Sequence, residues 1–218
     1  MTYFLLALNV VVYLFEWSLD DRAKTLLMYQ FGVVPQFVER ALHGLMPIEV
    51  AIVPLFTSMF LHASWWHIIA NMWALWIFGD NVEDRMGHIR YLIFYLVCGV
   101  LASLAHVLAT VMFSTDPGSL LIPSLGASGA ISGVLGGYIV LYPHRRVTAI
   151  VFRFLTDVPA YVAIGIWFAF QLISGLGMFG GGSQQGGVAY AAHIGGFVAG
   201  LLLIKVFTIN RGRTPTYG

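Results

Sequence analysis

Nine polar or ionisable side chains lie inside or at the edges of long apolar runs, where they could take part in chemistry. They are His62, His67, Asn71, His106, Ser128, Ser132, Asp157, Gln171 and His193. Such groups are costly to bury in an apolar surrounding and commonly serve a function. Ser128 and His193 both lie among glycines and other small residues. A serine whose proton a histidine can accept is an activated nucleophile, so this pair predicts acyl-transfer chemistry.

Acyl transfer also requires hydrogen-bond donors for the oxyanion that develops on the substrate. His67 and Asn71 are four residues apart and therefore share one face of a helix. Together with the backbone N–H groups at the start of the Ser128 helix, they can supply these donors. We identify no carboxylate at this depth on the outer side, so the constellation is predicted to be a Ser–His dyad and not a triad. His62 precedes this helix, so we expect it to point elsewhere and to make a structural hydrogen bond.

Small residues recur every four positions from Ser128 onward, and two glycines follow His193 at three and seven positions. They are Ser128, Ser132 and Gly136, with Gly129, Gly133 and Gly137 beside them, and then Gly196 and Gly200 on the face of His193. Faces of this kind let membrane helices approach closely. We therefore expect the two helices to pack together and to place His193 close to Ser128.

The composition requires membrane helices to position these residues. Of the 218 residues, 59% are hydrophobic and 10% are charged, against about 25% charged residues in soluble domains. The net charge is +1 and the basic residues form no run, which argues against binding of nucleic acid. Cys98 is the single cysteine, which excludes intramolecular disulfides and cysteine-based zinc sites. We expect an all-α polytopic membrane protein, one domain over residues 1–218, with the lipid bilayer as its main solvent.

Six spans are predicted, at about residues 2–17, 64–86, 89–113, 128–142, 148–176 and 188–209, with a long folded external loop over 18–63. Ser64 is expected to cap the second helix, and Gly87 to end it. The fourth helix is short, because about 15 residues extend roughly 22 Å and a bilayer core is about 30 Å thick. Its start then lies below the outer surface. In the fifth helix, Asp157 is expected to pair with Arg153, four residues away.

Basic residues are distributed unevenly between the two sides of these spans. One side carries Arg85, Arg90, Arg145, Arg146, Arg153, Lys205, Arg211 and Arg213, and the other carries Arg22, Lys24 and Arg40. The positive-inside rule then places both termini in the cytoplasm and Ser128 toward the outside. The start of the chain in an apolar run without a presequence favours the plasma (inner) membrane of a prokaryote. The glycine-rich stretch 177–187 is a candidate mobile cap over the site.

Three short motifs occur in order along the chain. They are His62, His67 and Asn71 as HxxxxHxxxN, Gly126-Ala127-Ser128-Gly129 as GxSG, and Ala192-His193-Ile194-Gly195-Gly196 with Gly200 as AHxxGxxxG. With them, the chain resembles the rhomboid family of intramembrane serine proteases from about residue 50 to 204. The resemblance implies that Ser128 is the nucleophile, that His193 is the general base and that His67 and Asn71 form the oxyanion hole. It implies a structural role for His62 and for Gly126, Gly129, Gly196 and Gly200, no metal or cofactor, and a lateral gate at the fifth helix.

The chain departs from the family pattern at two places. Many members carry a Trp-Arg pair where this chain has Val53-Pro54, just before Leu55-Phe56-Thr57. The contacts of that pair must therefore be replaced or absent. Some members carry an aromatic residue, stacked on the base, where this chain has Ser132. His193 must then be held in another way.

These features predict a serine endopeptidase that cleaves transmembrane segments of membrane-protein substrates. One alternative is a catalytically silent relative that only binds such segments. Another is a haem or metal protein that uses His62, His67 and His193, although a zinc site would usually include a charged or thiolate ligand. A transporter is the third, and the absence of an evident inverted repeat and of embedded carboxylates argues against it. The substrate and the oligomeric state stay open.

Overall fold

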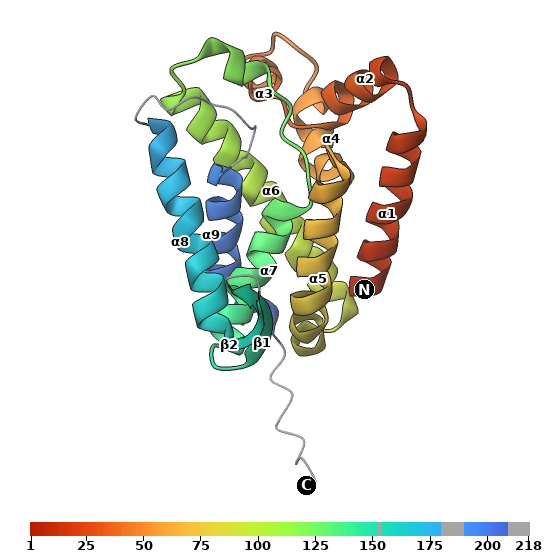
Figure 1. The fold of residues 1–218 in the computed structure, drawn as a ribbon. Coiled ribbons are helices and arrows are strands. Elements are labelled where there is room, and N and C mark those ends of the chain that lie inside the picture. The colour runs from red at the N-terminus through yellow and green to blue at the C-terminus, as the bar shows by residue number, and fades with distance from the viewer. Residues whose placement is uncertain (152–153, 180–189, 209–218) are drawn as a thin grey trace, which may run out of the picture.

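The computed structural model describes residues 1–151, 154–179 and 190–208, which form a bundle of helices (Figure 1). The helices are α1 (Thr2–Ser18), α2 (Asp21–Phe31), α3 (Pro35–Leu42), α4 (Glu49–Thr57), α5 (Trp65–Met86), α6 (His88–Phe113), α7 (Ser128–Leu141), α8 (Ala160–Phe179) and α9 (Tyr190–Phe207). The other elements are the 3-10 helices η1 (Ser58–Phe60) and η2 (Pro117–Leu121) and the antiparallel strands β1 (Arg146–Val151) and β2 (Phe154–Pro159). The predicted helical, polytopic architecture is confirmed.

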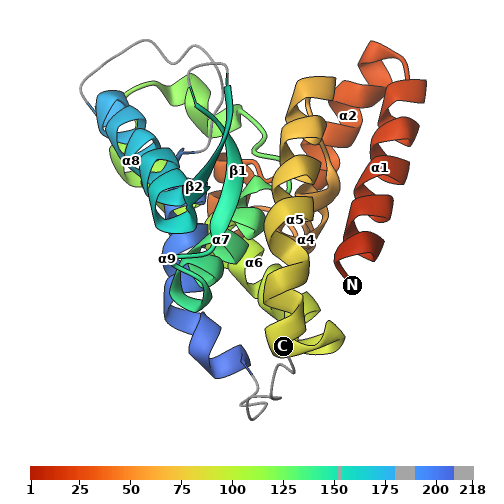
Figure 2. The same ribbon diagram turned by 60° about the horizontal axis from the view of Figure 1, so that its bottom comes forward.

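The short helix α7 lies at the centre of the bundle. In Figure 2 it lies between α8 and α9 on one side and α5 on the other, and α5, α6, α8 and α9 all pack against it. Every residue from Gly129 to Tyr138 is buried. Its four glycines, together with two serines and Ala130, leave room for neighbours on all sides, which explains how one short helix can pack against four others.

Two helix ends follow the expected capping chemistry. The side chain of Ser64 accepts a hydrogen bond from the backbone N–H of His67 at 3.2 Å, so it satisfies one of the free donors at the start of α5. Gly87 ends α5 with a φ of 76°, a conformation that glycine adopts without strain. The loop between α5 and α6 is therefore a single residue, and it fixes where α5 stops.

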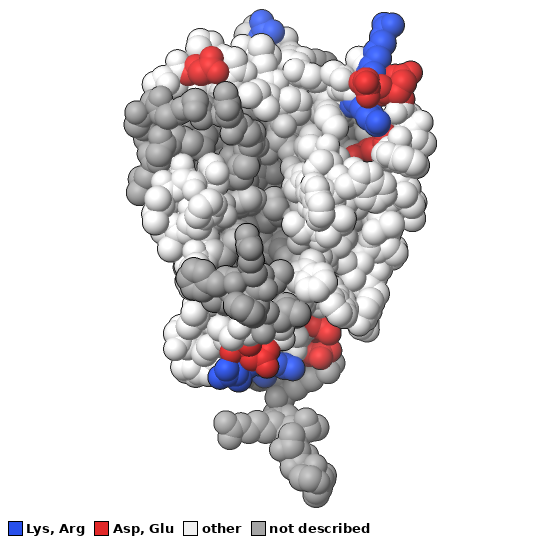
Figure 3. Space-filling model, viewed as in Figure 1, with Lys and Arg blue, Asp and Glu red and all other residues white. Residues whose placement is uncertain are grey.

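The dimensions of the helices suit a membrane. Among the described residues, α6 and α9 are long and apolar enough to cross a bilayer. A third span results if the segments 49–60 and 65–86, which are bent by 79° at their break, count as one. The helices α1 and α7 and the segment 160–175 of α8 are shorter and apolar. On the face shown in Figure 3, charged side chains gather at the two ends and a broad uncharged band separates them.

Five of the six predicted spans agree with α1, α5, α6, α7 and α9 to within two residues at each end. The fifth span is predicted as a helix over 148–176, and this prediction is wrong for the residues before Ala160. Residues 146–151 and 154–159 form the antiparallel strands β1 and β2, and α8 begins only at Ala160. The Thr148 hydroxyl donates to the Asp157 carboxylate at 2.7 Å across the two strands. The predicted helical pair of Asp157 with Arg153 therefore has no helix to support it, and Arg153 lies outside the described residues.

The predicted folded loop 18–63 contains α2, α3, α4 and η1, with α2 and α3 at the upper end of Figure 1. It is joined to the segment that leads into α7, because Val33 and Ser124 exchange two backbone hydrogen bonds of 2.9 and 2.8 Å. The loop therefore helps to fix where α7 starts.

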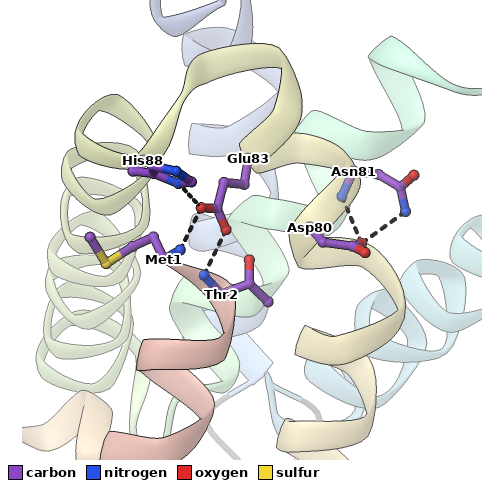
Figure 4. Close-up of polar contacts among 6 residues, drawn as sticks. All are labelled: Met1, Thr2, Asp80, Asn81, Glu83 and His88. Atoms are coloured by element: carbon purple, nitrogen blue, oxygen red, sulfur yellow. Dashed lines mark hydrogen bonds and ion pairs between the residues drawn. The ribbon is translucent and has the colours of Figure 1, made fainter.

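At the opposite end of α5, Glu83 holds the start of α1. Its carboxylate accepts from the amino group of Met1 at 2.5 Å and from the backbone N–H of Thr2 at 2.6 Å (Figure 4). The ring of His88 contacts the same carboxylate. This cluster joins α1, α5 and the first turn of α6, far from the start of α7.

Candidate active site

Ser128 is the first residue of α7, and the backbone just before it runs against a histidine ring. Gly126 has a φ of +120°, and a Cβ placed on it would lie 2.7 Å from both Cε1 and Nε2 of His67 and 3.7 Å from the Ser128 Oγ. The N–H of Gly126 donates to the Ser58 carbonyl at 2.8 Å. Only glycine fits this close approach, and the His67 ring and the Ser128 hydroxyl both lie near the point where a Cβ of residue 126 would be. The first N–H groups of α7 have no acceptor within the helix, so they are available to a ligand there.

His67 and Asn71 lie one turn apart on α5, as predicted. The Asn71 side-chain nitrogen donates to the His67 carbonyl at 2.9 Å, and Asn71 is buried. An amide nitrogen carries two hydrogens, so one is left after this bond. The pair can therefore present an imidazole and an amide N–H on the face of α5 that borders Gly126.

His62 differs from the expectation in one respect. Its ring is buried and lies edge-on to His67, with ring centroids 5.1 Å apart, and neither ring nitrogen has a partner among the described residues. The structural hydrogen bond comes from its backbone N–H, which donates to Glu16 at 3.1 Å. Loss of hydration in this surrounding lowers the pKa of His62 to about 3, and the nearby His67 adds to the effect. The His62 ring therefore packs as a neutral group behind His67.

Glu16 was missed at the sequence level, because it was counted as the end of an apolar span. It is 3% exposed, on the last turn of α1, so a buried carboxylate does lie beside His62. That no carboxylate lies at the depth of Ser128 stays a prediction. It borders a cavity of about 80 Å³ whose lining also includes Tyr13, Lys24 and His62. Among the described residues Glu16 bonds to the His62 backbone and not to His193, so it does not act as the third member of a triad.

The predicted packing of the Ser128 helix on the His193 helix is confirmed. The α7–α9 pair has the most extensive contact of any two elements. A Cβ on Gly196 would lie 2.1 Å from the Gly129 carbonyl oxygen, and one on Gly200 would lie 1.9 Å from that of Gly133. The two backbones thus touch directly at two successive turns. Because Gly129 follows Ser128 and Gly196 is one turn from His193, this contact brings the two reactive residues to the same level.

His193 is held by α8. Its Nδ1 lies 2.8 Å from the Gln171 Oε1, and its ring lies 5.9 Å from that of Trp167, measured between centroids. Gln171 is 5% exposed. Sequence inspection noted Gln171 as a polar residue in a span but gave it no role. The four-residue spacing of Trp167 and Gln171, which puts both on one helix face, is the signal that could have found it.

Ser132 makes no hydrogen bond to His193 within the part of the chain that the structure describes. Its hydroxyl donates to the Ser128 carbonyl at 2.6 Å, within α7. At the other departure from the family pattern, Pro54 is buried inside α4, and the Thr57 hydroxyl donates to the Phe31 carbonyl at 2.8 Å. This hydroxyl therefore links the end of α4 to the end of α2, and the two helices also pack against each other.

Several site predictions are not tested by these contacts. No hydrogen bond joins Ser128 to His193 within the described residues, so the dyad stays a prediction. Most of the proposed cap, 177–187, lies outside the described residues. Across the described ranges, no group of three or more His, Cys, Asp or Glu side chains is arranged to hold a metal ion.

Comparison with known proteins agrees with the architecture. The Rhomboid domain model matches residues 50–210. Rhomboid protein 1, mitochondrial, of Saccharomyces cerevisiae is 34% identical over 145 residues, which are 66% of this chain and 39% of that protein. RHOMBOID-like protein 1 of Arabidopsis thaliana is 32% identical over 165 residues, 75% of this chain and 36% of that protein. Presenilin-associated rhomboid-like protein, mitochondrial, of Homo sapiens is 28% identical over 200 residues, which are 90% of this chain and 45% of that protein.

The chain thus spans less than half the length of these curated relatives. Two of them are named mitochondrial, which conflicts with the expectation of a prokaryotic plasma membrane. That expectation depended on where the chain begins. Because the chain matches only part of each relative, its first residue gives no information on the membrane in which the protein is located. The match over most of the chain, on a polytopic helical bundle that carries the three motifs, shows that this protein belongs to the rhomboid family.

Proposed function

We propose that this protein is an intramembrane serine endopeptidase that hydrolyses a peptide bond in a transmembrane segment of another membrane protein. Ser128 is the nucleophile and His193 is the general base. The observation that supports this most is the direct backbone contact of Gly129 with Gly196. It places the serine at the free N-terminus of α7 beside the helix that carries the histidine. The membership in a family of intramembrane serine proteases supports the same chemistry.

The proposed reaction has two steps. In the first, the Ser128 Oγ attacks the substrate carbonyl carbon while His193 takes its proton, and the tetrahedral intermediate collapses as the C–N bond breaks and His193 protonates the amine. In the second, His193 activates a water molecule that cleaves the acyl-enzyme. The oxyanion receives hydrogen bonds from the His67 ring, the second Asn71 amide hydrogen and the first N–H groups of α7.

The substrate segment must unwind before Ser128 can reach a peptide carbonyl, because a helical peptide bond is shielded by its own side chains and hydrogen bonds. Residues that weaken a helix, such as glycine, should therefore be favoured near the cleavage site. We further propose that both termini lie on the basic, cytoplasmic side and that Ser128 opens toward the opposite side.

The test uses the purified full chain in liposomes with a fluorescently labelled transmembrane substrate. Cleavage is expected for the wild type and for Ser103→Ala, a control that removes a half-buried serine of α6. It should be lost in Ser128→Ala and His193→Ala, and a fluorophosphonate probe should label the wild type but not Ser128→Ala. Cleavage that survives Ser128→Ala would refute the proposal. Absence of both cleavage and fluorophosphonate labelling in the wild type would instead favour a protein that only binds transmembrane segments.

A further inference from the structure

The base of the proposed dyad has a partner that the family motifs do not include. The Nδ1 of His193 lies 2.8 Å from the Gln171 side-chain oxygen, which comes from α8 and not from the motif helices. Gln171 is almost fully buried, with 5% of its surface exposed. A buried polar pair of this kind has no water to compete with it, so its geometry is well defined.

A carbonyl oxygen can only accept a hydrogen bond, so the partner nitrogen must carry the proton. Neutral imidazole has one N–H, and with that hydrogen on Nδ1 the lone pair lies on Nε2. This is the tautomer that a general base needs when Nε2 faces the serine. In a triad a carboxylate selects the same tautomer, but no carboxylate contacts His193 in the described part of the chain.

We propose that Gln171 is a positioning residue for the base, which fixes the Nδ1–H tautomer and the ring orientation of His193. The inference depends on the proposed function, and it names the group that holds His193 in a chain with Ser132 in place of an aromatic residue. Trp167 supports the same orientation, because its ring lies one turn before Gln171 and 5.9 Å from the imidazole. The His193 ring on α9 is therefore oriented by side chains of α8.

Two substitutions separate this role from simple packing. Gln171→Met keeps the length of the side chain but removes the acceptor, and Gln171→Glu restores an acceptor oxygen. Asn9→Leu is the matched control, because it removes another fully buried amide, which donates to the Leu5 carbonyl in α1. Gln171→Met should lower kcat about 10- to 100-fold, by analogy with the loss of the partner that orients a metal-binding histidine. Its KM should change less than about threefold, because substrate binding is not affected.

Gln171→Glu should recover most of the lost kcat, and Asn9→Leu should leave kcat unchanged. Equal losses in Gln171→Met and Gln171→Glu, with unchanged thermal stability, would contradict the inference. A kcat of Gln171→Met close to that of the wild type would contradict it as well.

A second measurement does not depend on catalysis. Nitrogen NMR of histidine-labelled protein, with the His193 signals assigned by their loss in His193→Gln, reports which ring nitrogen carries the hydrogen. We expect protonated Nδ1 in the wild type and a mixture of tautomers in Gln171→Met. Protonated Nε2 in the wild type would overturn the inference even if the enzyme is active. Failure of the wild type to cleave, or cleavage by Ser128→Ala, would instead overturn the proposed function, whatever the tautomer.

Discussion

Replacement of Gly196 by alanine tests whether the close approach of α7 and α9 creates the site. A Cβ at this position would lie 2.1 Å from the Gly129 carbonyl oxygen, and ordinary contact begins at about 3.4 Å. The clash is with backbone, so no side chain can rotate away from it. The two helices must therefore separate by about 1.3 Å, or α9 must turn by a similar amount.

Either movement carries His193 away from Ser128, because both residues lie within one turn of the clash. A misplacement of about 1 Å can reduce a rate about 100-fold, and we expect Gly196→Ala to lose at least that much in kcat/KM. Overpacking of this kind also destabilises by about 1–3 kcal/mol. Cleavage of the labelled substrate in liposomes measures the first effect, and unfolding in increasing SDS measures the second.

Gly165→Ala on α8 is the matched control, because a Cβ there has nothing within 4 Å. Alanine stabilises a helix by about 1 kcal/mol relative to glycine, so this variant should be at least as stable as the wild type and equally active. If Gly196→Ala keeps kcat/KM within about threefold of the wild type, the distance between the helices does not limit the reaction. The link from glycine contact to chemistry would then be wrong.

Three further substitutions test other contacts. Gly126→Ala adds a Cβ 2.7 Å from the His67 ring at a φ of +120° and should abolish cleavage, whereas Gly44→Ala, with a φ of +71° and open space, should carry backbone strain without loss of activity. His62 has a pKa of about 3 in the folded protein against 6.5 when unfolded, so between these values only the unfolded chain binds the proton. The His62 ring therefore contributes a decrease in the free energy of unfolding as the pH drops below about 6.5, and this contribution should be absent from His62→Phe when pH-dependent SDS titrations of the two proteins are compared. Glu83→Gln should destabilise by about 1–3 kcal/mol through its charged hydrogen bonds without change in kcat, and unfolding of the exposed neighbour variant Asp84→Asn is the control.

The parts of the fold that the sequence could predict are those with a local or periodic cause. Ser64 and Gly87 mark the ends of α5 because capping depends on residues within one turn. The packing of α7 on α9 could be predicted because a repeat of small residues has one clear use in a membrane, which is close approach of backbones. The short fourth helix followed from the distance between its start and Pro143.

The parts that could not be predicted depend on partners far away in the chain. Strands β1 and β2 are apolar enough to resemble part of a span, and the bond of Thr148 with Asp157 that joins the two strands has no helical spacing. Glu16 looked like the polar end of α1, because its partner is a backbone N–H of the loop before α5. Gln171 had no assigned role because periodicity gives the face of a helix but not the neighbour that the face contacts.

Helices α7 and α8 both lie next to His193 of α9, but they stabilise the site in different ways. This difference has a measurable consequence. Lipid gives no hydrophobic driving force between helices, so α7 and α9 associate through the packing of their backbones at the glycines. The same contacts set the distance between Ser128 and His193, and substitutions there should reduce stability and activity together. In α8, Gln171 orients the ring of His193 through a single hydrogen bond of 2.8 Å. Loss of that bond should reduce activity by much more than the accompanying loss of stability would explain. A plot of kcat against the free energy of unfolding should therefore place Gly196→Ala and Gln171→Met on different lines. If both variants fall on one line, stability alone accounts for their activity.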